Sequence, residues 1–112
     1  MRTQKKDKKV IYLAGPITDV ENYWEPFEIA DDDLTSRGYI VLNPARLPQG
    51  MTNEQYTRID MAMIDAADVV YFLENWFRSK GANMEKNYCD YIGKPTAFFL
   101  EELFEVLGGM EG

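Results

Sequence analysis

The stretch Val10-Ile11-Tyr12-Leu13-Ala14-Gly15-Pro16 decides how the chain folds, because a short apolar run ends there in an abrupt loop. Such a run is typical of a strand that is buried on both faces of a sheet. Gly15 either lets the backbone come close to a ligand or simply makes the turn. We therefore expect residues 10–14 to form a buried strand that leads into a loop.

Three more apolar runs follow, at residues 39–42, 68–73 and 95–100, and segments with helical periodicity separate them. The helices are expected from about residue 25 to 37, from 52–53 to about 67, from about 79 to 93, and from 101 to 107. This alternation predicts an α/β fold, a Rossmann/flavodoxin-like three-layer sandwich with a parallel sheet of four or five strands. Residues 10–107 are expected to form one domain between a basic flexible tail, 1–9, and a flexible tail, 108–112, that begins at Gly108-Gly109.

In an open parallel sheet the ligand binds beyond the carboxyl ends of the strands, at the point where the strand order reverses. Three loops are expected to meet there: residues 15–21, 43–53 and 74–81.

The charge of the chain argues against a polyanionic partner. The 112 residues carry a net charge of −7, but residues 1–9 carry +4, so the remainder carries −11. We expect no binding to a nucleic-acid polymer. No stretch approaches 18 apolar residues and the N-terminus lacks the apolar core of a signal peptide, so we expect a cytoplasmic protein with no membrane partner.

The chain contains no histidine and a single cysteine, Cys89. These absences remove Ser-His-Asp and Cys-His catalysis, a disulfide framework, and the common histidine and cysteine metal sites. Acid–base chemistry must then use carboxylates, with tyrosine or lysine in support. We expect no metal and no cofactor.

Two carboxylates occupy inward positions of predicted helices. At about 100° per residue, Glu85 falls on an apolar stripe, and so does Asp60 on the preceding helix. A single inward acid is more often held in a structural ion pair. Two such acids beside one strand suit a catalytic pair that cleaves at an anomeric carbon. Tyr12 lies near the end of the first strand, where its hydroxyl would reach the site, although an ordinary core tyrosine would look the same. Aromatic residues near the loops would offer flat faces to a base or sugar: Tyr23, Trp24, Trp76 and Phe77.

The chain resembles the nucleoside 2-deoxyribosyltransferase superfamily, including the 2'-deoxynucleoside 5'-phosphate N-hydrolases and small phage-type members. The resemblance spans roughly residues 10–100 and rests on four motifs, which are Tyr12-Leu13-Ala14-Gly15-Pro16-Ile17, Arg58-Ile59-Asp60, Ala67-Asp68, and Ser79-Lys80-Gly81 with Glu85. It implies cleavage or transfer of the N-glycosidic bond of 2'-deoxynucleosides or their 5'-monophosphates, and a homodimer or higher homo-oligomer.

The resemblance also implies roles for individual residues. Glu85 would attack the anomeric carbon and form a covalent intermediate, Asp60 would assist proton transfer to the leaving base, and Tyr12 would orient the nucleophile. The sugar's 5' end or its phosphate would bind at Gly15, Ile17 and Ser79. The N-hydrolases usually carry an arginine where this chain has Thr18, and Arg78 or Lys80 would have to replace it. The residues expected to bind substrate are Gly15, Pro16, Ile17, Thr18, Trp24, Trp76, Ser79 and Gly81.

Two other functions stay open at this point. The same fold would serve a module that binds a nucleotide without turning it over, as a sensor or a sequestering protein. Alternatively, the aromatic residues and acidic surface would form an interface in a protein without enzymatic activity.

Overall fold

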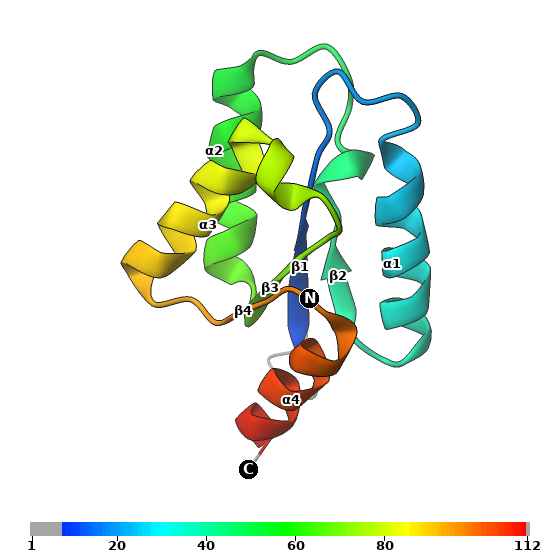
Figure 1. Cartoon of the computed structure of the whole chain (residues 1–112), viewed down its shortest axis with the longest axis vertical. Coiled ribbons are helices and arrows are strands. Elements are labelled where there is room, and N and C mark those ends of the chain that lie inside the picture. Colours follow the sequence, from blue (N-terminus) through cyan, green and yellow to red (C-terminus); the bar gives the residue numbers. More distant parts are fainter. Residues whose placement is uncertain (1–7, 112) are drawn as a thin grey trace, which may run out of the picture.

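The strands of the sheet are all parallel and follow the order β2-β1-β3-β4 (Figure 1). The computed structural model describes residues 8–111 of the chain. The strands are β1 (Val10–Ala14), β2 (Ile40–Leu42), β3 (Val69–Phe72) and β4 (Thr96–Ala97). Tyr12 on β1 pairs with Leu42 on β2 and with Val70 on β3, so it occupies the middle of the sheet.

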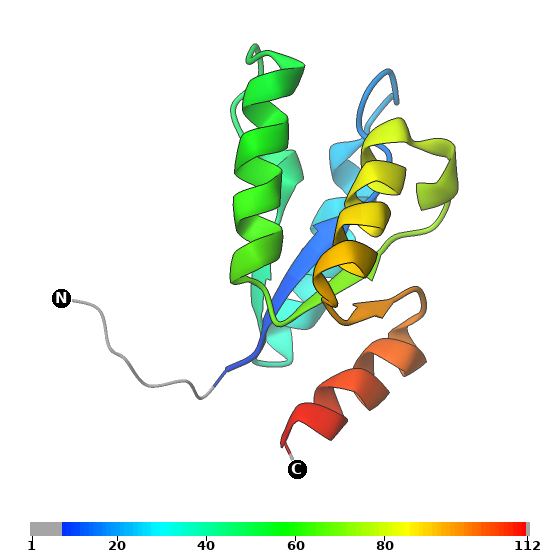
Figure 2. The ribbon, with the colours of Figure 1, turned by 90° about the vertical axis from the view of Figure 1, so that its left-hand side faces the viewer.

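Four α-helices cover the two faces of the sheet: α1 (Trp24–Ser36), α2 (Asn53–Ala66), α3 (Lys80–Ile92) and α4 (Leu100–Glu111). Alternate strand residues face opposite layers, as the period of a strand requires. Ile11 and Leu13 pack in one core with residues of α1 and α4, whereas Tyr12 and Ala14 pack in a second core with residues of α2 and α3. Figures 1 and 2 show this division, with α2 and α3 together on one side of the sheet and α1 on the other. The predicted three-layer α/β sandwich is confirmed, with four strands.

Local signals in the sequence set the helix ends that matter for function. Thr52 and Gln55 form a capping box at the start of α2, and the Ser79 hydroxyl accepts the Ala82 N–H at the start of α3. Gly93 ends α3 in the left-handed conformation, with φ of 73°. Two short 3₁₀ helices, η1 (Pro44–Arg46) and η2 (Trp76–Arg78), interrupt the loops after β2 and β3.

The C-terminal part of the chain differs from the prediction. The last strand has only two residues instead of the six expected at 95–100, because the Phe98 N–H bonds the Glu102 carboxylate and the chain turns into α4. The expected flexible tail at 108–112 is wrong for residues 108–111, since α4 continues through both glycines to Glu111. Leu103 and Leu107 are buried and Met110 packs against the same core, so the apolar stripe outweighs the low helix propensity of glycine.

The N-terminal tail predicted at residues 1–9 falls mostly outside the described residues, which begin at Lys8. The Lys9 carbonyl accepts the Ile40 N–H and so extends the pairing of β1 with β2. Within residues 8–111, no helix has the length and apolar character to cross a bilayer.

Candidate active site

A cavity of about 1000 Å³ lies beyond the carboxyl ends of β1 and β3. The three loops predicted to meet at this edge all contribute to its wall, together with the N-terminal halves of α2 and α3. This position is the switch point of the sheet, because β2 lies on one side of β1 and β3 on the other. The fold therefore brings residues from three separate stretches of the chain, 12–23, 44–61 and 75–85, around one space.

Glu85 is a buried carboxylate with a single side-chain hydrogen-bond partner among residues 8–111. It is 6% exposed on α3 and lines the cavity. The Tyr12 hydroxyl, fully buried on β1, donates a hydrogen bond to Glu85 Oε2 over 2.5 Å. No lysine or arginine among residues 8–111 forms an ion pair with Glu85. The structural ion pair that would have explained an inward glutamate is therefore absent from the described part of the chain.

Asp60 lines the same cavity from α2 and is half-buried. Its Oδ1 atom is buried and makes no hydrogen bond to any described residue. Buried polar atoms are nearly always paired, so an orphaned carboxylate oxygen needs a reason. A ligand that donates a hydrogen bond or accepts a proton at this point would supply the missing partner.

The environment shifts both carboxyl groups toward their protonated forms. Burial raises the pKa of Glu85 from 4.5 to about 8; the hydrogen bond from Tyr12 lowers it in part, and the charge of Asp60 raises it. Burial also raises the pKa of Asp60 from 3.8 to about 6. Burial, together with the charge of Glu85, raises the pKa of the Tyr12 hydroxyl well above 10, so Tyr12 stays a hydrogen-bond donor. The two acids interact, and between about pH 6 and pH 8 the pair holds one proton.

Most of the residues predicted to bind substrate line the cavity, namely Gly15, Pro16, Ile17, Thr18, Ser79 and Gly81. Close packing in the core explains why residue 15 is a glycine. A Cβ there would lie 3.2 Å from Phe27 Cζ and 3.3 Å from Leu73 Cβ, so the absent side chain makes room for the core. At Gly81 an added Cβ would meet only the Ser79 hydroxyl at 3.8 Å, and the space beside it is open.

The two predicted tryptophans do not line the cavity. Trp24 begins α1 and is 47% exposed, whereas Trp76 packs its ring against Phe72 and Phe98 in the core beneath α2 and α3. The aromatic side chains that line the cavity are Tyr12, Tyr56 and Tyr23, and Tyr23 is one of the aromatic residues predicted near the loops. Tyr56 was not predicted as a site residue, although it stands one helical turn before Asp60 on the same stripe, and this spacing could have pointed to it.

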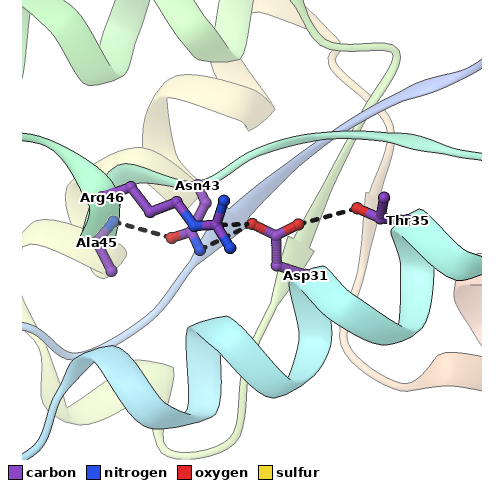
Figure 3. Close-up of polar contacts among 5 residues, drawn as sticks. All are labelled: Asp31, Thr35, Asn43, Ala45 and Arg46. Atoms are coloured by element: carbon purple, nitrogen blue, oxygen red, sulfur yellow. Dashed lines mark hydrogen bonds and ion pairs between the residues drawn. The ribbon is translucent and has the colours of Figure 1, made fainter.

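The loop between β2 and α2 is held in place by a buried carboxylate that the sequence reading missed (Figure 3). Asp31 on α1 is 7% exposed and accepts hydrogen bonds from Thr35 and from the Asn43 side-chain amide, and Arg46 Nε lies 3.5 Å from its Oδ2. Asn43 in turn accepts the Ala45 N–H and so caps η1. Pro44 and Ala45 line the cavity, so this cluster fixes part of its wall.

Further hydrogen bonds hold the same loop to α2 and to the loop after β1. The Tyr56 hydroxyl donates to the Pro48 carbonyl over 2.6 Å and accepts the Met51 N–H over 3.3 Å. Gln49 donates to the Tyr23 hydroxyl over 3.2 Å and joins this loop to the loop after β1. The wall is thus tied down at both of its ends.

Two cations, Arg78 and Lys80, line the cavity where η2 leads into α3. Neither forms an ion pair with any carboxylate among residues 8–111. The Asn83 side chain donates to the carbonyls of Phe77 and Ser79 and thereby fixes this turn. An anionic ligand group would find two unpaired cations here. Among the described residues, no group of three or more acidic or cysteine side chains is arranged to hold a metal ion.

Fold and site together define a small parallel α/β domain in which two carboxyl groups, those of Asp60 and Glu85, line one cavity at the switch point of the sheet without an ion pair to any lysine or arginine among residues 8–111. A family described as "Domain of unknown function (DUF4406)" matches residues 9–98, and the chain belongs to this family. The match contains the whole sheet and both acids and ends before α4. No curated protein matches the chain.

The raised pKa of Glu85 predicts how stability changes with pH. The native state binds this proton more tightly than the unfolded chain does, so the stabilisation is complete below about pH 4.5 and is lost as the pH rises through about 8. We expect the free energy of unfolding of the wild type to fall by several kcal/mol over this range, since each pKa unit corresponds to about 1.4 kcal/mol. Glu85→Gln should flatten the decline between pH 6 and 8, as measured by urea unfolding. The matched Glu105→Gln, at an exposed position on α4, should leave the wild-type slope in place. Parallel curves for wild type and Glu85→Gln would contradict the assignment.

Proposed function

We propose that this protein cleaves or transfers the N-glycosidic bond of a 2'-deoxynucleoside or its 5'-monophosphate. The observation that carries the proposal is the pairing of Glu85 with Tyr12 in a cavity that also holds the orphaned carboxylate oxygen of Asp60. Reactions at an anomeric carbon use two carboxyl groups with different protonation, and this cavity holds such a pair. The similarity of the motifs to those of nucleoside 2-deoxyribosyltransferases supports the same chemistry.

In the proposed mechanism, the Glu85 carboxylate attacks C1' of the deoxyribose as the bond from C1' to the base nitrogen breaks. The bonding electrons leave with the base, and Asp60 donates the proton that the departing nitrogen needs. Tyr12 holds Oε2, so Oε1 is the oxygen available for attack. Water or a second base then attacks C1' and frees the Glu85 carboxylate, and Asp60 takes up the proton released by that nucleophile.

This mechanism requires the shared proton to lie on Asp60 at the moment of attack. In the empty cavity the burial of Glu85 favours the opposite arrangement, because its pKa is the higher of the two. The bound base must therefore shift the proton from Glu85 to Asp60. It does so by accepting a hydrogen bond from Asp60, which stabilises the protonated form of that side chain. The total charge of the pair stays the same, so only the position of the proton changes.

The remaining parts of the proposal have two sources. The resemblance implies a homodimer or higher homo-oligomer, which sedimentation would test, and the hydropathy of the sequence predicts a cytoplasmic location, which fractionation would test. The alternative function is a module that binds a nucleotide and releases it intact. The unpaired cations Arg78 and Lys80 suit this alternative as well as they suit an enzyme, so the two functions differ only in whether free base appears.

Glu85→Ala should abolish release of free base, lowering the rate by about 10³-fold or more, because the nucleophile is gone. The measurement is chromatography of reactions with a panel of deoxynucleosides and their monophosphates, with and without an acceptor base. Glu105→Ala, an exposed glutamate on α4, serves as the control and should keep full activity. Base release by Glu85→Ala at the wild-type rate would remove Glu85 from the mechanism.

Wild-type protein that is stabilised by a nucleotide in thermal unfolding, but leaves it intact, would instead support the binding module. No thermal shift with any of these ligands would point to an interaction protein.

The rate of base release should follow a bell-shaped pH profile. Below about pH 6 both acids are protonated and no nucleophile is present, and above about pH 8 neither can donate a proton. We therefore expect kcat/KM to be highest near pH 7 and to fall about tenfold per pH unit well outside the two limits. Asp60→Asn should lower the rate and remove the basic limb, because the proton donor is gone, whereas the acidic limb should stay, because Glu85 must still be ionised to attack. A rate that stays constant from pH 5 to 9 would exclude the carboxyl pair from the rate-limiting step.

Replacing the two cations that line the cavity, Arg78 and Lys80, shows whether the substrate carries a 5'-phosphate. Replacing Arg78 and Lys80 with alanine should raise KM for a deoxynucleoside 5'-monophosphate about 10- to 100-fold, because a charge-assisted hydrogen bond to phosphate contributes about 1.5–3 kcal/mol. KM for the nucleoside without phosphate should change little. Arg58→Ala, on the exposed side of α2 and paired with Glu54, is the matched control. Equal effects on both substrates would indicate that the cations do not bind the phosphate.

A further inference from the structure

The C-terminal halves of α2 and α3 are joined by a contact that lies outside the cavity. The Tyr88 hydroxyl on α3 donates a hydrogen bond of 2.6 Å to Asp65 Oδ1 on α2. Among residues 8–111 this is the one side-chain hydrogen bond between the two helices. Just beyond α3, the Lys94 ammonium donates to the carbonyls of Ala67, at 2.5 Å, and Asp65, at 3.3 Å, and so binds the C-terminal end of α2.

The positions of these groups along the helices relate them to the site. The cavity takes residues from α2 only as far as Met61 and from α3 only as far as Glu85. Tyr88 follows Glu85 by three residues, about one turn, and Asp65 follows Asp60 by five. Figure 2 shows α2 and α3 side by side on one face of the sheet. The two helices are thus separated by the cavity along their first halves and connected along their second halves.

We propose that Tyr88 and Asp65, with Lys94, form a clamp that sets the distance between Asp60 and Glu85. The proposal rests on the function proposed above, in which these two acids share one proton and act on the same sugar. Tyr88 and Asp65 touch no substrate in this arrangement, so they are positioning residues. Tyr88 lies about one turn after Glu85 on α3, and Asp65 lies shortly after Asp60 on α2. Because each helix is rigid, the hydrogen bond between Tyr88 and Asp65 fixes how far apart the turns that hold the two acids lie.

The protonation state of Asp60 and Glu85 depends on the distance between them, so a titration detects a change in that distance. Glu85 faces Tyr12 from β1 and Asp60 from α2, and Cys89 lies one turn along its own helix. The rim cations Arg78 and Lys80 line the same cavity. If the clamp opens, α3 moves away from α2, the charge of Asp60 acts on Glu85 from farther away, and water reaches both acids. Both changes favour ionised Glu85.

The test replaces the hydroxyl alone, in Tyr88→Phe, and follows the Glu85 carboxyl by carbon-13 NMR titration of the full chain. We expect the acid dissociation constant of Glu85 to rise about tenfold, which is one pKa unit. The kcat for base release should fall about 10- to 100-fold, with a smaller change in KM, because a misplacement of about 1 Å has this effect on a reacting pair. Tyr91→Phe is the matched control, since Tyr91 lies on the same helix and is 89% exposed.

Substitutions on α2 separate positioning from mere support of the fold. Asp65→Ala removes the acceptor and should reproduce Tyr88→Phe, whereas Asp65→Asn keeps an acceptor oxygen and should restore both the titration and the rate. An unchanged Glu85 titration in folded Tyr88→Phe and Asp65→Ala would overturn the clamp, as would equal shifts in Tyr91→Phe. The NMR titration needs no turnover. A wild type that releases no base would therefore refute the proposed function while the titration still decides whether the clamp sets the distance.

Discussion

The hydrogen bond between Tyr12 and Glu85 joins the middle strand of the sheet to the helix that follows β3, and the candidate site is arranged around it. Tyr12 is fully buried, with strands on both sides, so its hydroxyl has a fixed position. An ionised carboxylate buried without a cation is strongly disfavoured. The protein meets this constraint in two ways: burial raises the pKa of Glu85 to about 8 and favours its neutral form, and the Tyr12 hydroxyl stabilises the carboxylate when it is ionised.

The topology explains why such a group stands at this edge of the sheet. Because β1 lies between β2 and β3, the loops after β1 and β2 and the turn after β3 diverge and leave a space beyond the strand ends. The Asp31 cluster then fixes the β2–α2 loop at its start and Tyr56 fixes it at its end, so one wall of the space is rigid (Figure 3). A rigid wall and a buried donor are what a preorganised site needs.

The sequence predicted those features that depend on helical and strand periodicity. Asp60 and Glu85 stand out because acids at inward helix positions break a regular pattern, whereas Tyr12 stands out because it lies near the end of the first strand. An inward acid is also present at Asp31, which shares a stripe with Phe27 and Leu34, but it stands in a run with Asp32 and Asp33, a pattern typical of a solvated face.

Features set by tertiary contacts could not be read in this way. The direction of the Trp76 ring depends on the η2 turn and on Phe98, which is distant in the sequence. The length of α4 depends on burial of Leu107 and Met110 and not on the glycines between them.

The contrast among the three inward acids bears directly on function. Asp31 has donors at both carboxylate oxygens and a nearby arginine, so its burial is fully compensated and serves the structure. Glu85 has one donor and Asp60 has a buried oxygen with none among the described residues. A glutamine at position 85 would still accept the Tyr12 hydrogen bond and would avoid the cost of a buried acid at neutral pH. A protein that can compensate a buried acid completely at one place, yet leaves two others uncompensated around a single cavity, gives up stability where a ligand would need reactive groups. Incomplete compensation, more than burial alone, is therefore the structural reason to assign chemistry to this pair.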